Sequence, residues 1–114
     1  MPSSPPRLVL ITDRHGTAVV EAALDAGLPA VQLRDKELPG RPLLALAERL
    51  RLATARTGAL LFVNDRVDVA LAVGADGVQL GTGSMPADVA RRLLPAGTLI
   101  GVSTHAPGEA SAGA

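Results

Sequence analysis

Three polar side chains stand at and just after a short aliphatic run, in a spacing that suits anion binding. Gln32, Arg34 and Lys36 alternate along the chain, so their side chains share one face while the backbone stays extended. An amide and two cations on one face would form a clamp for phosphate or pyrophosphate. The alternative is that residues 34–36 are only a solvated, charged loop.

A second polar pair, Asn64 and Asp65, follows another aliphatic run. A carboxylate at such a strand end could hold a magnesium ion that bridges phosphate oxygens. The alternative is a helix cap, because Asp65 and Asp68 have the spacing of a capping box. One residue can serve both purposes.

The third polar cluster is Ser103, Thr104 and His105. Hydroxyl and backbone N–H groups at a strand end can cradle an anion, and a histidine beside them can move a proton near neutral pH. The alternative for His105 is a solvent-exposed loop residue. Ser84, which stands two residues before Pro86, most simply caps the helix that follows.

The elements that must position these residues are short aliphatic runs that alternate with stretches of helical period. The predicted strands are residues 8–12, 30–33, 60–64, 77–80 and 98–102. The predicted helices cover about 18–26, 43–57, 67–73 and 89–94, and a fifth begins within 108–114. Strict alternation of strand and helix predicts right-handed crossovers and a parallel sheet.

Two α/β architectures fit this alternation, a doubly wound open sheet and the first part of an eight-stranded barrel. Gln32, Asn64 and Gln79 lie near the ends of predicted strands. In an open sheet with helices on both faces, an unpaired buried amide would cost about 1–3 kcal/mol. In a barrel, strand ends open into a mouth where ligand and water supply partners, so these amides favour the barrel.

Composition limits the function classes. The 114 residues suit one domain, 7–114, after a loose tail at 1–6. The net charge is zero and Phe62 is the single aromatic residue, which argues against nucleic-acid binding. The chain has no cysteine, which excludes thiolate chemistry. The apolar run near the start is too short for a signal peptide or membrane span, so we expect a cytoplasmic protein without membrane partners.

Four segments, "LVLITDR", "AVQLRDKE", "FVNDRVDVALAVGADGVQLG" and "GVSTHAPGEA", resemble the thiamine phosphate synthase and TenI superfamily. The resemblance implies a TIM-type (β/α)8 barrel that is truncated after about five strands. Thiamine phosphate synthases join hydroxymethylpyrimidine diphosphate to thiazole phosphate and release pyrophosphate with the help of magnesium. TenI-type proteins tautomerise a carboxylated thiazole phosphate, and a histidine shuttles the proton.

The resemblance also implies roles for individual residues. Gln32, Arg34 and Lys36 match a substrate and pyrophosphate motif, Q-x-R-x-K. Asn64 and Asp65 match an N-D pair in which the aspartate is a magnesium ligand.

Further along the chain the resemblance divides between the two branches. Ser103 matches a serine that contacts pyrophosphate, and His105 matches the catalytic histidine of TenI-type proteins. Gln79, taken as a substrate-binding residue, stands where synthases usually have histidine, and Ser84 replaces their second metal-binding aspartate. One carboxylate should bind magnesium more weakly than two.

These departures favour a TenI-like thiazole phosphate tautomerase that needs no metal. Thiamine phosphate synthase is the alternative. A third hypothesis is an inactive half-barrel that binds ligand or self-associates through its open sheet edges.

Overall fold

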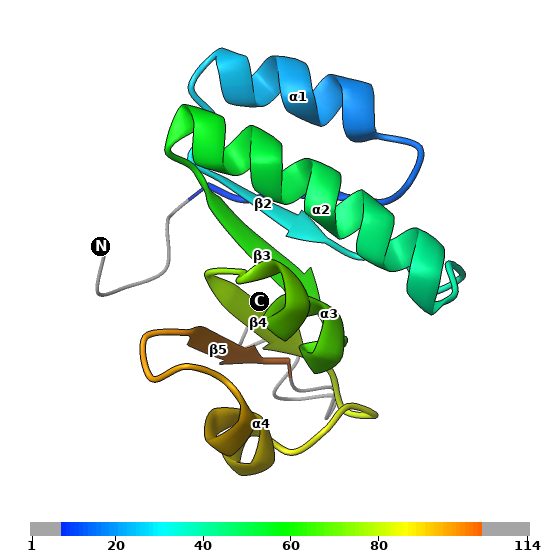
Figure 1. Cartoon of the computed structure of the whole chain (residues 1–114), viewed down its shortest axis with the longest axis vertical. Helices are drawn as coiled ribbons and strands as arrows, with labels where there is room; N and C mark the ends of the chain where they lie inside the picture. The colour runs from blue at the N-terminus through cyan, green and yellow to red at the C-terminus, as the bar shows by residue number, and fades with distance from the viewer. Residues whose placement is uncertain (1–7, 104–114) are drawn as a thin grey trace, which may run out of the picture.

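The structure, a computed structural model, describes residues 8–103 and alternates strands with helices (Figure 1). The elements are β1 Leu10–Thr12, α1 Thr17–Asp25, β2 Ala30–Leu33, α2 Gly40–Thr57, β3 Leu60–Asn64, α3 Val67–Val73, β4 Gly77–Leu80, α4 Ala87–Leu93 and β5 Leu99–Val102. The predicted strands and helices are confirmed, with β1 starting two residues later and β5 one residue later than expected. Residues 104–114, with the expected fifth helix, lie outside the described residues.

All five strands are parallel and follow their order in the chain, β1-β2-β3-β4-β5. Right-handed crossovers between successive neighbours place every helix on the same face of the sheet. Thus α2 lies over β2 and β3, and α3 lies over β3 and β4 (Figure 1). A doubly wound sheet reverses its strand order near the middle. The sequential order therefore confirms the barrel-type arrangement and excludes the open-sheet alternative.

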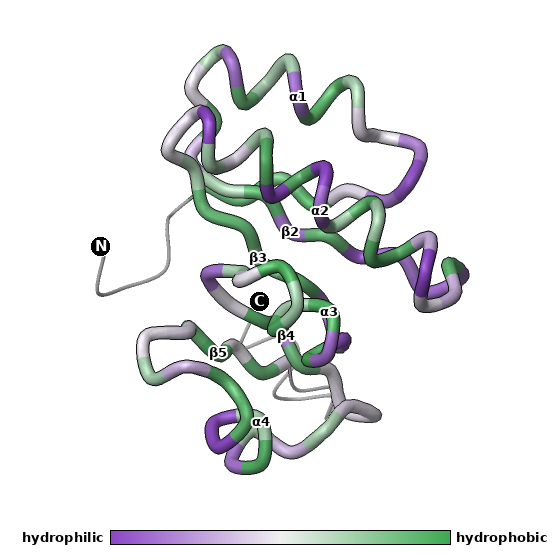
Figure 2. The backbone as a smooth tube through the Cα atoms, viewed as in Figure 1, coloured by the Kyte–Doolittle hydropathy of each residue, from purple (hydrophilic) through white to green (hydrophobic). Residues whose placement is uncertain are grey.

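The hydrophobic core fills the layer between the sheet and the helices. Strand residues at alternate positions are buried there, namely Val31, Leu33, Leu61, Val63, Val78 and Leu80. They pack with Leu24 of α1 and Leu50 of α2. Figure 2 shows β3 as a nearly unbroken hydrophobic segment, whereas hydropathy alternates along the turns of α1 and α2. Because side chains alternate across a strand, Gln32 and Gln79 face the opposite side of the sheet.

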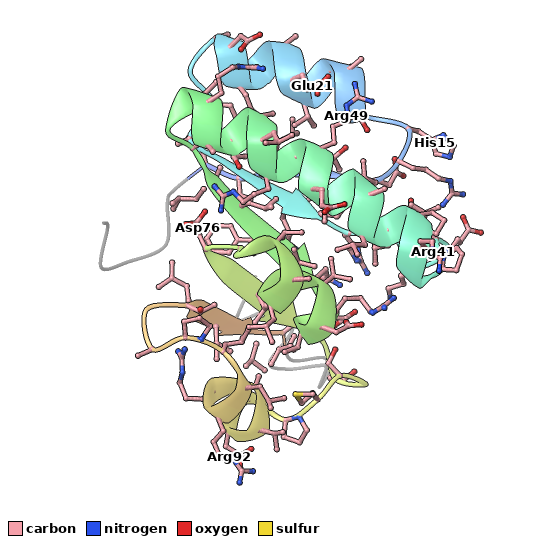
Figure 3. The ribbon with its side chains drawn as sticks, in the orientation of Figure 1. His15, Glu21, Arg41, Arg49, Asp76 and Arg92 are labelled. Atoms are coloured by element: carbon pink, nitrogen blue, oxygen red, sulfur yellow. The ribbon has the colours of Figure 1, made fainter. Side chains whose placement is uncertain are left out.

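A glycine ends α2, and an ion pair links α2 to α1. Gly58 follows α2 with a φ of 76°, a left-handed conformation that glycine adopts without strain. Arg49 of α2 pairs with Glu21 of α1 at 2.7 Å (Figure 3). The side chains of His15 and Arg92 point into solvent in the same view. Among the described residues, no helix is both long enough and apolar enough to span a membrane.

A second, partly open cavity of about 250 Å³ has a lining that includes Val9, Phe62 and Leu99. At Gly77 a Cβ atom would lie 2.6 Å from the Phe62 ring and 2.9 Å from the Leu99 carbonyl oxygen, so no larger residue fits without a shift. Self-association through the outer strands β1 and β5 stays a prediction.

Candidate anion-binding site

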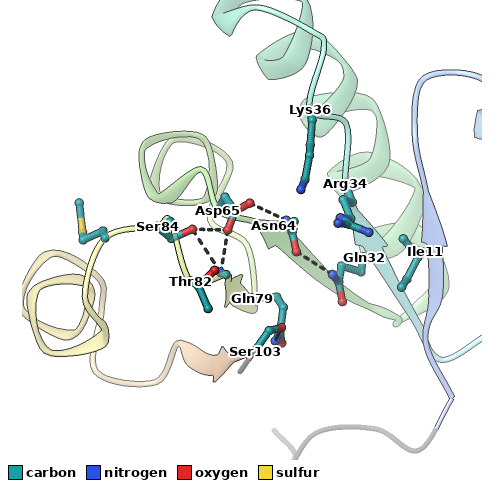
Figure 4. Close-up of a pocket in the computed structure, with 13 residues that line it drawn as sticks. Ile11, Gln32, Arg34, Lys36, Asn64, Asp65, Gln79, Thr82, Ser84 and Ser103 are labelled. Carbon is teal, nitrogen blue, oxygen red and sulfur yellow. Dashed lines mark hydrogen bonds between the residues drawn. The ribbon is translucent and has the colours of Figure 1, made fainter. Parts of the chain in front are cut away.

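A cavity of about 830 Å³ opens at the carboxyl ends of the strands (Figure 4). Seven of its lining residues are those that the sequence singles out, Gln32, Arg34, Lys36, Asn64, Asp65, Gln79 and Ser103. They come from β2, β3, β4 and β5 and the loops that follow. The structure thus brings together every candidate site residue within its described range. His105, the candidate catalytic residue, lies outside that range.

Asp65 is the centre of the hydrogen-bond network in this cavity. Its Oδ1 accepts the Gly81 backbone N–H at 2.8 Å and the Ser84 hydroxyl, and its Oδ2 accepts the Asn64 amide at 2.8 Å. The φ of Asp65 is 66°, in the left-handed region that aspartate tolerates better than most residues. This conformation turns the carboxylate toward the loop after β4 instead of toward α3.

The predicted capping roles of Asp65 and Ser84 are therefore wrong. The N-cap position of α3 belongs to Arg66, which pairs with Asp68 at 2.9 Å, and no side chain caps the helix. The N-cap position of α4 belongs to Pro86, again with no side-chain cap. Ser84 instead accepts the Gly81 N–H at 3.2 Å and donates to Asp65, so its hydroxyl is part of the cavity wall.

The carboxyl group of Asp65 has a pKa below its ordinary value of 3.8. Burial would raise the pKa, but the hydrogen bonds from Ser84 and Gly81 and the charges of Lys36 and Arg34 outweigh it. Asp65 is therefore ionised at neutral pH and acts only as a hydrogen-bond acceptor. Both cations line the same cavity as this carboxylate (Figure 4).

The charge of Asp65 fixes the orientation of two neighbouring amides. Because an ionised carboxylate only accepts, Asn64 must turn its Nδ2 toward Asp65 and its Oδ1 away. The Asn64 Oδ1 then accepts from the Gln32 Nε2 at 3.0 Å (Figure 4). Within residues 8–103 the Gln32 Oε1 has no protein donor, so it can accept a hydrogen bond from a ligand.

Arg34 and Lys36 provide the positive charge of the cavity. Both side chains are exposed and line it, and neither forms an ion pair with any residue in the described part of the chain. Asp65 is the one carboxylate among the residues that line the cavity. Two cations facing one carboxylate leave the site with a net charge of one positive unit, which favours an anionic ligand.

Gln79 and Ser103 also line the cavity. The Gln79 Nε2 donates to the Ser103 Oγ at 2.7 Å. The Ser103 oxygen is thereby an acceptor toward Gln79, which leaves its O–H free to donate to a ligand. A Cβ atom at Gly101 would collide with the Gln79 Oε1, so glycine at this position makes room for the amide.

The sequence interpretation did not identify a role for Asp35, because it placed this residue in the same exposed loop as its neighbours. Asp35 does not line the cavity, and its side chain is only 2% exposed. It lies between the two cations in sequence but points away from them, toward the loop after β1. The alternation of side chains along residues 32–36 could have indicated this orientation, because it places residue 35 on the face opposite to that of residues 34 and 36.

The chain is similar to known proteins over most of its length. The family model described as thiamine monophosphate synthase matches residues 8–114. A thiamine-phosphate synthase of Gloeobacter violaceus is 57% identical over 106 residues, which are 91% of this chain and 31% of that protein. One of Methanoculleus marisnigri is 48% identical over 102 residues, which are 84% of this chain and 48% of that protein.

A solved structure gives the same result. The thiamine phosphate pyrophosphorylase of Pyrococcus furiosus superposes with a TM-score of 0.78 at 43% identity, covering 91% of this chain and 52% of that one. The chain therefore spans about half or less of the length of the proteins that it matches.

Proposed function

We propose, because the chain belongs to the thiamine monophosphate synthase family, that it carries the diphosphate-binding part of a thiamine-phosphate synthase. The reaction implied by the family joins hydroxymethylpyrimidine diphosphate to thiazole phosphate and releases pyrophosphate. The observation that carries the proposal is a pair of cations, Arg34 and Lys36, which line the cavity and form no ion pair within the described residues. A diphosphate is the anion that would use both.

The chemistry asks the protein to stabilise a departing anion. The bond between the pyrimidine methylene carbon and the diphosphate oxygen breaks, and its electron pair leaves with pyrophosphate. The ring nitrogen of the thiazole then donates its lone pair to the methylene carbon, which forms the new C–N bond. Arg34, Lys36 and the free O–H of Ser103 would donate to the pyrophosphate oxygens, whose charge grows as the bond breaks.

A magnesium ion held mainly by the substrate would find one carboxylate ligand among the described residues of this cavity. Magnesium in phosphate-transfer sites is commonly bound by one or two carboxylates together with phosphate oxygens. Asp65 is ionised and lines the cavity, and the Ser84 hydroxyl donates to it. The family resemblance implies that synthases carry their second metal-binding aspartate at the position of Ser84. We propose that Asp65 is the metal ligand of the chain. When bound, the ion would neutralise part of the charge of the diphosphate.

The tautomerase reading, which Gln79, Ser84 and His105 favour, has less support than the synthase alternative. The named relatives are thiamine-phosphate synthases, and so is the family description. The cavity also provides two cations, whereas a thiazole monophosphate would need fewer. Gln79 donates to Ser103, so it orients a hydroxyl that lines the cavity and would donate to pyrophosphate.

Turnover separates the two activities. A full-length version of the protein, with the rest of the barrel present, is given the pyrimidine diphosphate and thiazole phosphate with and without magnesium, and thiamine phosphate is measured by chromatography. In a parallel reaction it is given the carboxylated thiazole phosphate alone, and tautomerisation is followed. We expect magnesium-dependent thiamine phosphate and no tautomerisation that depends on His105. Tautomerisation that His105→Ala abolishes, without thiamine phosphate formation, would overturn the proposal.

A further inference from the structure

The loop that carries the two cations is fastened to a neighbouring loop by a buried carboxylate. The Arg34 backbone N–H donates to the Thr12 carbonyl oxygen at 2.8 Å, which extends the β1–β2 pairing by one bond. Asp35 follows and does not line the cavity, and the backbone bends over the next three residues, 36–38. From here on, side-chain bonds to Asp35 replace the strand ladder.

The Asp35 carboxylate accepts four hydrogen bonds. Its Oδ2 accepts the Arg14 backbone N–H at 3.1 Å, and its Oδ1 accepts the Arg14 Nη1 at 2.7 Å. The same Oδ1 accepts the backbone N–H groups of Glu37 at 3.0 Å and Leu38 at 3.1 Å. The bonds to Glu37 and Leu38 close a turn around Lys36, and the bonds to Arg14 tie that turn to the loop after β1.

Asp35 is ionised in this position. Burial would raise its pKa, but the backbone N–H donors of Arg14, Glu37 and Leu38 and the charge of Arg14 outweigh it and lower the pKa. Arg14 also donates from Nη2 to the Glu37 Oε1 at 2.9 Å. The guanidinium thus bridges two residues of the turn and offsets a negative charge that would otherwise weaken an anion site.

We propose that Asp35, held by Arg14, is a positioning residue that fixes Arg34 and Lys36 toward a bound diphosphate. The inference rests on the proposed function, because it takes those two cations as the diphosphate ligands. Its physical basis is preorganisation: a loop fixed before binding loses less conformational freedom when the ligand arrives. Asp35 does not line the cavity, so it would act only through its neighbours.

The test is a double-mutant cycle on binding of inorganic pyrophosphate, measured by calorimetry with magnesium present. We expect Asp35→Asn to weaken binding about tenfold in the wild-type chain, which corresponds to about 1.4 kcal/mol. In an Arg34→Gln background the same change should weaken binding about threefold or less, because only Lys36 remains to be positioned. A purely structural role would give equal losses in both backgrounds.

A matched control is Asp25→Asn, since Asp25 also pairs with an arginine, Arg56, at 2.8 Å but on the exposed side of the helices. It should leave pyrophosphate binding unchanged. Should Asp35→Asn fail to fold, Arg14→Gln tests the same link, because it keeps the carboxylate and its bonds to Glu37 and Leu38.

The possible results separate the two proposals. Equal losses in both backgrounds, or wild-type affinity in Asp35→Asn, would overturn the positioning role and leave the proposed function standing. Wild-type protein that does not bind pyrophosphate would overturn the cation clamp and the proposed function with it.

Discussion

Replacing Arg34 and Lys36 together by glutamine is expected to lower the affinity for pyrophosphate about 100-fold. Each cation would make a charge-assisted hydrogen bond to the diphosphate, and such bonds contribute about 1.5–3 kcal/mol each. Even the lower values sum to about 3 kcal/mol, and every 1.4 kcal/mol changes an equilibrium constant about tenfold. Calorimetric titration with inorganic pyrophosphate measures the change directly.

The control must remove the same net charge from another part of the surface. Arg41 and Arg92 are exposed and do not line the cavity (Figure 3). Arg41→Gln with Arg92→Gln therefore reproduces the change in overall charge and should keep pyrophosphate affinity within about threefold of wild type, because neither side chain lines the cavity and exposed charges are screened by salt. If the cavity double variant binds as well as this control, the cation clamp is wrong.

The second large effect is expected for Asp65→Asn, which should remove the enhancement of pyrophosphate binding by magnesium. The substitution keeps the shape of the side chain but removes the one carboxylate that lines the cavity. It also places an amide where the Gly81 N–H, the Ser84 hydroxyl and the Asn64 amide all donate, so one donor loses its acceptor. We expect magnesium to tighten pyrophosphate binding at least tenfold in the wild-type chain and less than twofold in the variant.

Asp68→Asn is the matched control, because Asp68 pairs with Arg66 and does not line the cavity. Its response to magnesium should equal that of the wild type. A magnesium response that survives in Asp65→Asn would move the metal ligand elsewhere.

Acid unfolding gives an independent measurement on the same variant. The folded-state pKa of Asp65 lies below the ordinary value of 3.8, so its ionised form stabilises the fold. That contribution is fully present above pH 3.8 and is lost as the pH falls through the lower, folded-state pKa. The difference in unfolding free energy between wild type and Asp65→Asn should therefore be constant near neutral pH and shrink in acid.

The strands and the position of the site were predictable from sequence because both depend on local patterns. Short aliphatic runs such as 30–33 and 60–64 are bounded by glycine, proline and polar residues, which leaves little freedom for their ends. Parallel strands bring their carboxyl ends to one edge of the sheet, so polar residues after separate runs had to meet there. Gln32 and Asn64, 32 residues apart in sequence, are hydrogen-bonded for this reason.

The hydrogen bonds within the site were not predictable, because they depend on which loops become neighbours. Asp65 has the spacing of a helix cap, yet its left-handed backbone directs the carboxylate to Gly81, sixteen residues later. The sequence predicts that Asp35 is a charged residue of an exposed loop. Its partner in the structure is Arg14, which lies 21 residues away in sequence. The residue types at positions 79 and 84 favoured a tautomerase. In the structure, the Ser84 hydroxyl donates a hydrogen bond to Asp65 and so forms part of the site.

The ligand proposed for this cavity is a diphosphate attached to a pyrimidine. The most direct measurement is a calorimetric titration of the chain with hydroxymethylpyrimidine diphosphate and, separately, with the corresponding monophosphate, both with magnesium. The second phosphoryl group would engage the second cation, so we expect the diphosphate to bind at least about tenfold more tightly, and the difference to vanish in the Arg34→Gln, Lys36→Gln variant. Equal affinity for the two ligands in the wild-type chain would contradict the account.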